Sequence, residues 1–440
     1  MVTRRRPARK LMPALSHVEG LQVIARTSSA AVARSAVDVR DAGRRLAAGT
    51  IVEGSVRRSG NRVRVTVQLV ETAEGGHLWS DRYDRELRDV LELEDEIAEA
   101  VARRLRSELA TSGLRRRRRP VDPAAYEAYL KGRHLFHSRA GSEAMAQAAA
   151  LLERSIEFDA SFAPAFDALA ELYWYLGFFG GMPPRDAFGQ SMWYAMRALE
   201  LDEGLAETHA LLAMLKKELD YDWAEVDREV ARARALNRDS PAVRVRSAVS
   251  ALLPHGRLEE ALAEIDAALS RDPLSMFVRW WSGVVAYLAR QPQRVLEEGR
   301  RMVVLEPSNP LGHWVLGSGH ALEGEVEDAL VQLAEAARLS GEAPFFAGFL
   351  ALAQGQNART AEARAILDRL LAASGERYVQ PFSVALCYIG LGEWDEAFRC
   401  IDSAVEQRDP LVIPVKSFVF LDPVRDDPRF GSVLAAMNLS

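Results

Sequence analysis

Cysteine is nearly absent from this sequence. Its 440 residues contain two, Cys387 and Cys400, which is too few for the disulfide framework that many small secreted proteins need. Both fall in segments with helical spacing, where a free cysteine packs as a small apolar side chain more often than it takes part in redox chemistry. We therefore expect two buried thiols and a reducing, cytoplasmic compartment.

Long apolar runs are lacking as well. No segment reaches the ~18 consecutive apolar residues that a membrane-spanning helix needs. The first residues, MVTRRRPARKLMPALSH, are basic but contain no apolar core of a signal peptide. Residues 1–13 are predicted to be a disordered start, and no membrane span is predicted.

The short motifs of common enzyme classes are missing too. The sequence contains no Gly-Lys-Ser/Thr phosphate loop, no His-Glu-x-x-His and no Gly-x-Ser-x-Gly. His134 and His137 are three residues apart on a predicted helix, but the sequence places no third metal ligand beside them. We predict no catalytic, cofactor-binding or metal-binding residues, no cofactor and no enzyme activity.

Charge is distributed unevenly along the chain. Residues 1–122 contain 25 Lys and Arg against 17 Asp and Glu, and the remainder contains 31 against 45, so a basic front precedes an acidic remainder. Such a front could contact nucleic acid or dock against the acidic part. Residues 113–123 are predicted to be an Arg-rich linker, either a solvated hinge or a contact for an anion. Because no aromatic side chains for base stacking lie between the arginines, nucleic-acid binding is disfavoured.

What the sequence does contain is a repeat of 34 or 35 residues. Counting back from Ala404, the same position recurs at intervals of 34 or 35 residues and once of 43, at Leu370, Ala336, Met302, Ala268, Ala233, Ala198 and Ser155. A second column lies seven residues earlier and holds small or β-branched side chains, at Ala397, Ala363, Ala329, Val295, Ala261, Val226, Ser191 and Ala148. Small residues are needed where two helices cross closely, so each repeat predicts one helix pair.

The clearest repeat is YVQPFSVALCYIGLGEWDEAFRCIDSA, residues 378–404, which reads as two short helices around Gly392. Its pattern and its period resemble the tetratricopeptide repeat (TPR). The predicted fold class is therefore mainly α, a TPR α-solenoid of about eight helix pairs at residues 124–410, preceded by a small α/β domain. An irregular helical bundle is the alternative. Residues 411–440 are predicted to be a carboxyl-terminal capping segment that contains a short amphipathic helix.

The front of the chain has the pattern of that small α/β domain. A strand, a capped helix, a two-stranded hairpin, a further strand and an amphipathic helix are predicted in this order, at residues 21–24, 38–48, 50–69, 77–83 and 90–109. Asp38 is the predicted helix cap. Val63, Val65 and Val67 alternate with polar residues, as in a half-buried strand.

The hairpin sequence, TIVEGSVRRSGNRVRVTVQLVETAEGGHLWSDRYDREL, and the following LEDEIAEAVARRL resemble the TolB-like amino-terminal domain of bacterial TPR proteins. The resemblance implies a partial TolB-like domain at residues 14–112. In that family the domain commonly lies between an effector and a TPR array, and the effector is a nucleotide cyclase, a winged-helix DNA-binding domain or a kinase. The family's first strand has no counterpart here, which implies either a truncated domain or a start upstream of Met1.

Stacked helix pairs form a concave surface that suits peptides and helices. The interval of 43 residues places extra residues near 177–185, where two phenylalanines are costly to leave in water. They form either a ligand-facing lip or a loop folded onto its own solenoid. Because aromatic residues are enriched at binding hot spots, the predicted partner-binding residues are Tyr173, Trp174, Phe178, Phe179, Trp280 and Trp314.

The predicted function is a non-catalytic protein–protein interaction scaffold in a bacterial signalling or regulatory assembly, with a protein or peptide partner in the concave surface. The alternative, implied by the TolB-like resemblance, is the regulatory or sensory portion of an adenylate or guanylate cyclase or of a winged-helix transcription regulator whose effector domain is absent from this chain.

Overall fold

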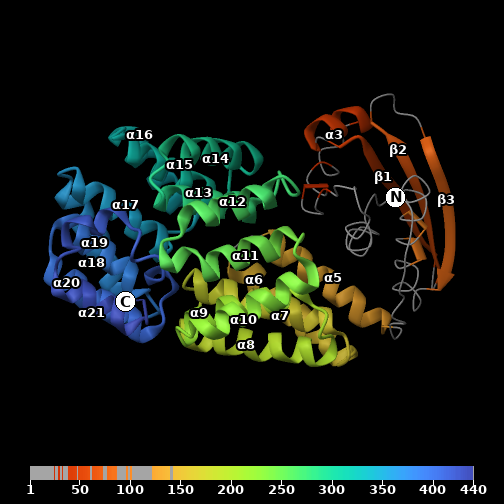
Figure 1. Cartoon of the computed structure of the whole chain (residues 1–440), viewed down its shortest axis with the longest axis horizontal. Helices are drawn as coiled ribbons and strands as arrows, with labels where there is room; N and C mark the ends of the chain where they lie inside the picture. The colour runs from red at the N-terminus through yellow and green to blue at the C-terminus, as the bar shows by residue number, and fades with distance from the viewer. Residues whose placement is uncertain are drawn as a thin grey trace. The chain divides into compact units, whose positions relative to one another are not determined.

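The structure is a computed structural model, and it describes residues 24, 28–29, 32, 38–46, 48–59, 62–72, 77–86, 96–97, 100–101, 121–138 and 142–439 (Figure 1). The chain forms two compact units. The first comprises Met1–Leu130, Arg154–Phe162 and Leu269–Ser275, and the second comprises Lys131–Glu153, Ala163–Ala268 and Met276–Ser440. The predicted disordered start, nearly all of the first strand, most of the helix at 90–109 and nearly all of the Arg-rich linker lie outside the described residues.

Among its described residues, the first unit contains the helix α3 and a three-stranded antiparallel sheet with the strand order β1-β2-β3. These elements are α3 (Val39–Leu46), β1 (Thr50–Ser59), β2 (Arg62–Glu71) and β3 (His77–Glu86). Asp38 caps α3 as predicted, because its carboxylate accepts the backbone N–H of Asp41 at 2.8 Å. Ser59 pairs with Arg62 across the β1–β2 turn, so the predicted hairpin is confirmed.

The central strand β2 provides the apolar face of this sheet. Val63, Val65 and Val67 are at most 4% exposed, which confirms the predicted alternation. On the opposite face, Arg64 forms an ion pair with Asp84 of β3 at 2.7 Å. The hydrogen bond from Arg64 holds the pKa of Asp84 below its usual value. Ile97 and Val101, from the predicted helix that follows, are both helical and completely buried.

Eight helix pairs follow in the described part of the chain, as the repeat predicts. They are α5–α6 (Pro123–Ser138, Ser142–Phe158), α7–α8 (Ala163–Phe178, Pro184–Leu201), α9–α10 (Ala206–Leu219, Trp223–Asn237), α11–α12 (Pro241–Ala251, Leu258–Leu269), α13–α14 (Met276–Leu288, Pro292–Leu305), α15–α16 (Pro310–Glu323, Val326–Leu339), α17–α18 (Pro344–Gln356, Thr360–Ala373) and α19–α20 (Pro381–Leu391, Trp394–Gln407). The predicted fold class, a TPR α-solenoid preceded by a small α/β unit, is confirmed.

The two repeat columns explain how the pairs stack. Every residue of the first column is at most 4% exposed, and every residue of the second is at most 2% exposed. Each lies on the second helix of its pair, where small side chains permit close packing against neighbouring helices. Gly256, Gly324 and Gly392 end first helices or the short turns after them with φ between +73° and +78°, a left-handed conformation that glycine adopts without steric cost.

Two features differ from a regular repeat. The additional residues of the α7–α8 pair lengthen both helices as well as the loop, and Phe178 is the last residue of α7 rather than part of a loop. After α20, the chain forms two short 3-10 helices, η3 (Pro410–Val412) and η4 (Val419–Val424), and then α21 (Pro428–Ala436). Asp427 caps α21 by accepting the backbone N–H of Arg429 at 2.9 Å, so the predicted terminal helix is confirmed. The domain boundaries given above remain predictions.

Within the described residues, we find no helix that combines the length and the hydrophobicity needed to cross a membrane.

Candidate functional site

A cluster of aromatic side chains lies inside the second unit. The residues come from four helix pairs, and in each pair they lie on the first helix. We call them the aromatic wall: Phe178 of α7, Trp280 and Trp281 of α13, Trp314 of α15, and Phe345 and Phe349 of α17. The ring centroids of Phe178 and Trp280 are 5.6 Å apart, and those of Trp314 and Phe345 are 5.3 Å apart. Each residue of the wall is at most 6% exposed. Offset and edge-on ring contacts of this kind stabilise a cluster beyond the area that it buries.

A segment of the carboxyl end covers this wall. We call residues 409–421 the strap. Its apolar side chains are nearly all buried, and those of Leu411, Val412 and Ile413 are at most 6% exposed. The described backbone–backbone hydrogen bonds of residues 412–421 join residues within the strap, such as that from the N–H of Val412 to the carbonyl of Asp409 at 3.2 Å. Arg425, just after the strap, donates to the carbonyl oxygens of Lys416 and Phe418. The strap is therefore held against the helices by its side chains.

Asp409 fixes the beginning of the strap. Its carboxylate accepts the backbone N–H of Phe382, in the first turn of α19, and that of Leu411, each at 3.0 Å. The side chain is completely buried, and burial raises the pKa of Asp409 to about 6, although both hydrogen bonds oppose the rise. The strap thus begins where a helix amino terminus favours a negative charge.

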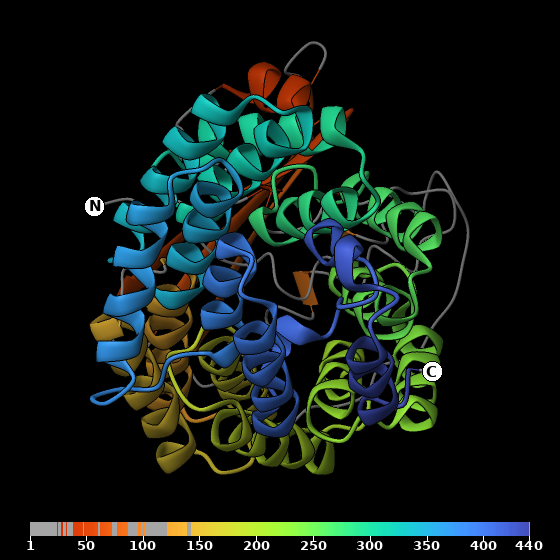
Figure 2. The same ribbon diagram turned by 90° about the vertical axis from the view of Figure 1, so that its left-hand side faces the viewer.

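Polar contacts also join the carboxyl end to helices that lie more than 200 residues earlier. Gln380 donates to the carbonyl oxygen of Phe178 at 3.0 Å, and Arg185 donates to that of Glu406 at 2.7 Å. Trp223 donates its indole N–H to the carbonyl oxygen of Met437 at 3.1 Å. The array of the second unit therefore turns back on itself, and Figure 2 shows its dark blue carboxyl end beside the green helices of the third pair.

A cavity of about 50 Å³ lies between the strap and the aromatic wall. Leu411, Ile413 and Phe418 line it from the strap, and Phe178, Trp280, Trp314 and Phe345 are among the residues that line it from the helices. Lys217 of α9 is the one charged residue among the lining residues. A closely packed protein interior leaves few voids larger than a water molecule, so a space of this size can hold a small molecule.

Lys217 belongs to a buried group of three polar side chains. Its Nζ lies 3.1 Å from Oε1 of Glu218, and the two side chains are 2% and 0% exposed. The indole N–H of Trp174 donates to the other carboxylate oxygen of Glu218 at 2.9 Å. Burial raises the pKa of Glu218, while the Lys217 ammonium and the indole N–H act in the opposite direction. The indole thus satisfies one oxygen of the buried carboxylate, whereas Oε1 has the ion pair with Lys217 but no hydrogen-bond partner among the described residues.

The six predicted partner-binding residues lie in two places. Trp174, Phe178, Trp280 and Trp314 are at most 6% exposed, and Phe179 contacts Trp280 at 5.5 Å between ring centroids. These five lie in or beside the aromatic wall, and Phe179 is partly buried. Tyr173 instead stacks on Tyr194 of α8, with ring centroids 5.5 Å apart. Burial raises the pKa of Tyr173, and its hydroxyl donates to Glu153 at 3.4 Å.

The stack of Tyr173 on Tyr194 continues into an exposed surface that we call the α8 patch. Trp193 is 55% exposed and Met196 is 53% exposed. They are three residues apart and therefore share a face of α8. All eight tryptophans are described, and Trp193 is the one that is classed as exposed. Helical spacing alone does not distinguish Trp193 from a buried tryptophan, so no pattern in the sequence indicated this patch.

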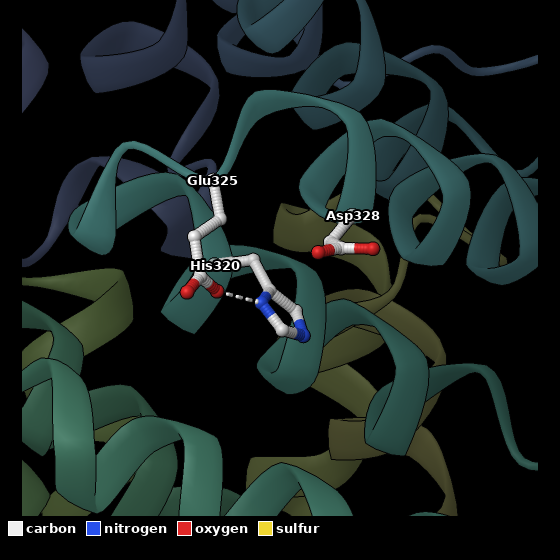
Figure 3. Close-up of side chains that lie close together, drawn as sticks. All are labelled: His320, Glu325 and Asp328. Carbon is white, nitrogen blue, oxygen red and sulfur yellow. Dashed lines mark hydrogen bonds and ion pairs between the residues drawn. The ribbon is translucent and has the colours of Figure 1, made fainter.

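His320, Glu325 and Asp328 form the cluster of potential metal ligands found among the described residues (Figure 3). His320 Nδ1 lies 2.5 Å from Oε2 of Glu325, and both acidic residues are exposed. The corresponding positions in the last repeat, 68 residues later, hold Glu393 and Glu396. Acidic residues are favoured at the start of a helix, so the repeat itself accounts for this cluster.

The two cysteines are free. Cys387 is completely buried, which confirms the prediction for that residue, and Cys400 is half-buried. Burial raises the pKa of Cys387 to about 12 and that of Cys400 to about 11. Both side chains are therefore thiols at neutral pH, the less reactive form of cysteine.

Comparison with known proteins gives one curated relative and several structures of similar fold. No family model matches the sequence. A curated protein of Rhizobium meliloti (strain 1021), named "Putative adenylate cyclase 3", is 35% identical over 204 residues, which are 46% of this chain and 34% of that protein. The chain thus spans about a third of the length of the curated relative that it matches.

Among the solved structures of similar fold are three that are each 14% identical. YrrB, described as a TPR protein with an unusual peptide-binding site, has a TM-score of 0.28 over 43% of this chain and 93% of its own. The human IFIT1 dimer with m7Gppp-AAAA has a TM-score of 0.48 over 71% and 78%. Yeast Tom70 has a TM-score of 0.41 over 79% and 77%. The repeat columns and the eight helix pairs of this chain make it a TPR-like protein.

Proposed function

We propose that this protein is a non-catalytic interaction scaffold in a bacterial signalling or regulatory assembly. The observation that carries the proposal is the array of eight stacked helix pairs, since solenoids of this kind present extended surfaces to other proteins. We further propose a cytoplasmic location and a partial TolB-like identity for the α/β unit. The hairpin sequence supports this identity, and so does the antiparallel register of β1, β2 and β3.

The α8 patch is the surface at which we propose that a protein partner docks. Trp193 and Met196 expose large apolar side chains, and the stacked pair of Tyr173 and Tyr194 lies beside Trp193. Tryptophan and tyrosine are enriched among residues that contribute most to binding. Tyr173, one of the six predicted residues, belongs to this surface. Phe178, Trp280 and Trp314 line the cavity beneath the strap, so a partner would reach these three only after the strap moved away.

Replacing Trp193 and Met196 together with serine is expected to lower partner recovery at least tenfold. The reason is that the two changes remove most of the exposed apolar area of the patch while leaving the helix columns intact. The measurement is in-cell cross-linking of the tagged full chain, followed by quantitative mass spectrometry of the cross-linked proteins. The readout is cross-links that include residues of α8.

The matched control replaces two exposed valines on other second helices. Val304 is 80% exposed and Val331 is 61% exposed, so serine at these positions removes apolar surface without reaching the patch. We expect partner recovery by this variant to equal that of the unchanged protein. Equal losses in both variants would remove the α8 patch from the proposal, and an absence of cross-linked partners with every variant would contradict the scaffold.

A second candidate is a regulatory or sensory role for an adenylate cyclase. The 204-residue match to a protein of that name favours it. If it is correct, the double serine variant of Trp193 and Met196 should change the cyclic AMP content of the source cells at least twofold, while the Val304 and Val331 control should not. Unchanged cyclic AMP would favour a different assembly. Formation of cyclic nucleotide by the purified chain from ATP or GTP with Mg²⁺ or Mn²⁺ would contradict both candidates.

A further inference from the structure

The cavity beneath the strap has the composition of a small binding site. Its walls are aromatic and aliphatic side chains, and Lys217 is the charged residue among them. Mostly apolar walls with a few placed polar groups are typical of pockets that bind small organic molecules. Unlike surface lysines, Lys217 is 2% exposed. A buried ammonium among rings holds its charge away from water, so it favours an anionic partner close by.

Glu218 is one anionic partner of Lys217, but it does not use all of the N–H donors of the ammonium. Neighbouring residues of a helix do not face each other, so the ammonium of Lys217 and the carboxylate of Glu218 are not directly opposed, although Nζ lies 3.1 Å from Oε1. An ammonium has three N–H donors. Among the described residues, Glu218 is the one ionic partner of Lys217. Donors therefore remain for another acceptor on the cavity side.

The net charge of the Lys217–Glu218 pair also favours an anion nearby. Burial raises the pKa of Glu218, so its proton is held more tightly in the folded protein than in the unfolded chain. Whenever Glu218 is protonated, the ammonium of Lys217 has no compensating charge within the pair. A carboxylate in the cavity would restore the balance, and Trp174 would continue to donate to Glu218 at 2.9 Å.

The size of the cavity limits the ligand. A buried water needs about 10–15 Å³ of such space, so a cavity of about 50 Å³ holds on the order of three to five heavy atoms. Acetate and propionate have this size. We propose that the cavity binds a short-chain monocarboxylate, with its carboxylate on Lys217 and its alkyl group against the aromatic wall and the strap.

Binding would couple to the strap because the strap is one wall of the cavity. Leu411 and Ile413 line it from that side, and between residues 412 and 421 no described backbone–backbone hydrogen bond joins the strap to a helix of the array. A ligand that fills the space adds contacts to both walls. It should therefore slow the local opening of the strap, which is otherwise held by side chains.

The experiment uses the purified full chain with sodium propionate and sodium acetate as probes. The neutral amides propionamide and acetamide, and sodium chloride at equal ionic strength, serve as controls. We expect saturable one-to-one binding of propionate by calorimetry, at least tenfold tighter than propionamide. Hydrogen exchange of peptides from residues 409–421 should slow with propionate and stay unchanged with chloride.

Two variants test the two halves of the site without leaving an unpaired buried charge. The double variant Lys217→Met with Glu218→Gln removes both charges and should bind propionate at least tenfold more weakly. Leu411→Phe fills the cavity from the strap and should weaken propionate binding by a similar factor while Lys217 remains. Lys216→Met changes the neighbouring residue and should leave the affinity for propionate unchanged.

The proposal is overturned if neither carboxylate binds, or if propionamide binds as tightly as propionate. Binding that persists in the double variant would also overturn it, because the carboxylate would then lie elsewhere. None of these outcomes bears on partner recovery at the α8 patch.

Discussion

Replacing Gly355 with alanine is expected to lower the free energy of unfolding by about 3 kcal/mol. A Cβ at this position would lie 2.4 Å from the backbone carbon and oxygen of Gly390, where α17 and α19 cross. Backbone atoms cannot turn aside as a flexible side chain can, so the two helices would have to separate. Alanine gains up to ~1 kcal/mol over glycine within a helix, which is smaller than the cost of the clash, so the net effect is destabilising.

Urea denaturation monitored by circular dichroism checks this prediction. Gly431→Ala is the matched control, because Gly431 lies in α21 and a Cβ there would meet no atom within 4 Å. That change should leave stability equal or raise it by up to ~1 kcal/mol. If Gly355→Ala and the unchanged protein unfolded at the same urea concentration, α17 and α19 would lie further apart than in this structure.

The repeat could be predicted from the sequence because its signal is local. Ala336 and Ala404 lie on second helices, and each packs within its own pair and against neighbouring pairs. The need for a buried side chain at this position, small in most repeats, therefore recurs at intervals of 34 or 35 residues, and once of 43. The same argument applies to Gly324 and Gly392, whose left-handed conformations end first helices at equivalent positions. Local spacing alone was enough to predict eight helix pairs.

The interior site could not be predicted in the same way, because it depends on contacts across the whole array. Phe178 meets Gln380 after 202 residues of chain, and the strap covers the aromatic wall only because the array turns back on itself. No periodic pattern encodes how far each pair rotates on the last. The sequence thus indicated that aromatic residues such as Trp280 and Trp314 matter, but not that the strap lies over them.

Lys217 was missed for a related reason. It follows Lys216 in a run of charged residues, KKELD, which is typical of a solvated helix end. Lys216 matches that expectation, since its side chain is 33% exposed and lies 3.4 Å from Asp220. Lys217 points to the other side of α9, where only the strap and the first helices exclude water. One residue of helical rotation, about 100°, separates the two environments.

Replacing Lys217 with methionine is expected to destabilise the protein by about 3–5 kcal/mol at pH 8, because it leaves a buried carboxylate without its charge partner. Burial already raises the pKa of Glu218, and removal of the ammonium raises it further. Since the folded protein then binds this proton more tightly than the unfolded chain, the contribution of Glu218 to stability is greatest at low pH. It is lost as the pH rises through the folded pKa. The loss in the variant should therefore be smaller at pH 5 than at pH 8.

Urea denaturation of the full chain at pH 5 and pH 8 measures this difference, and two further variants separate charge from packing. Lys216→Met removes an exposed pair, which should change stability by less than ~1 kcal/mol at both pH values. The double variant Lys217→Met with Glu218→Gln carries a glutamine whose amide oxygen can still accept the N–H of Trp174. Removing both charges of a buried pair is often nearly neutral, so this variant should recover most of the lost stability and show little change between the two pH values. A loss in the single variant that was equal at pH 5 and pH 8, and that the glutamine did not reverse, would mean that the lysine acts through its packing against the cavity rather than through its charge.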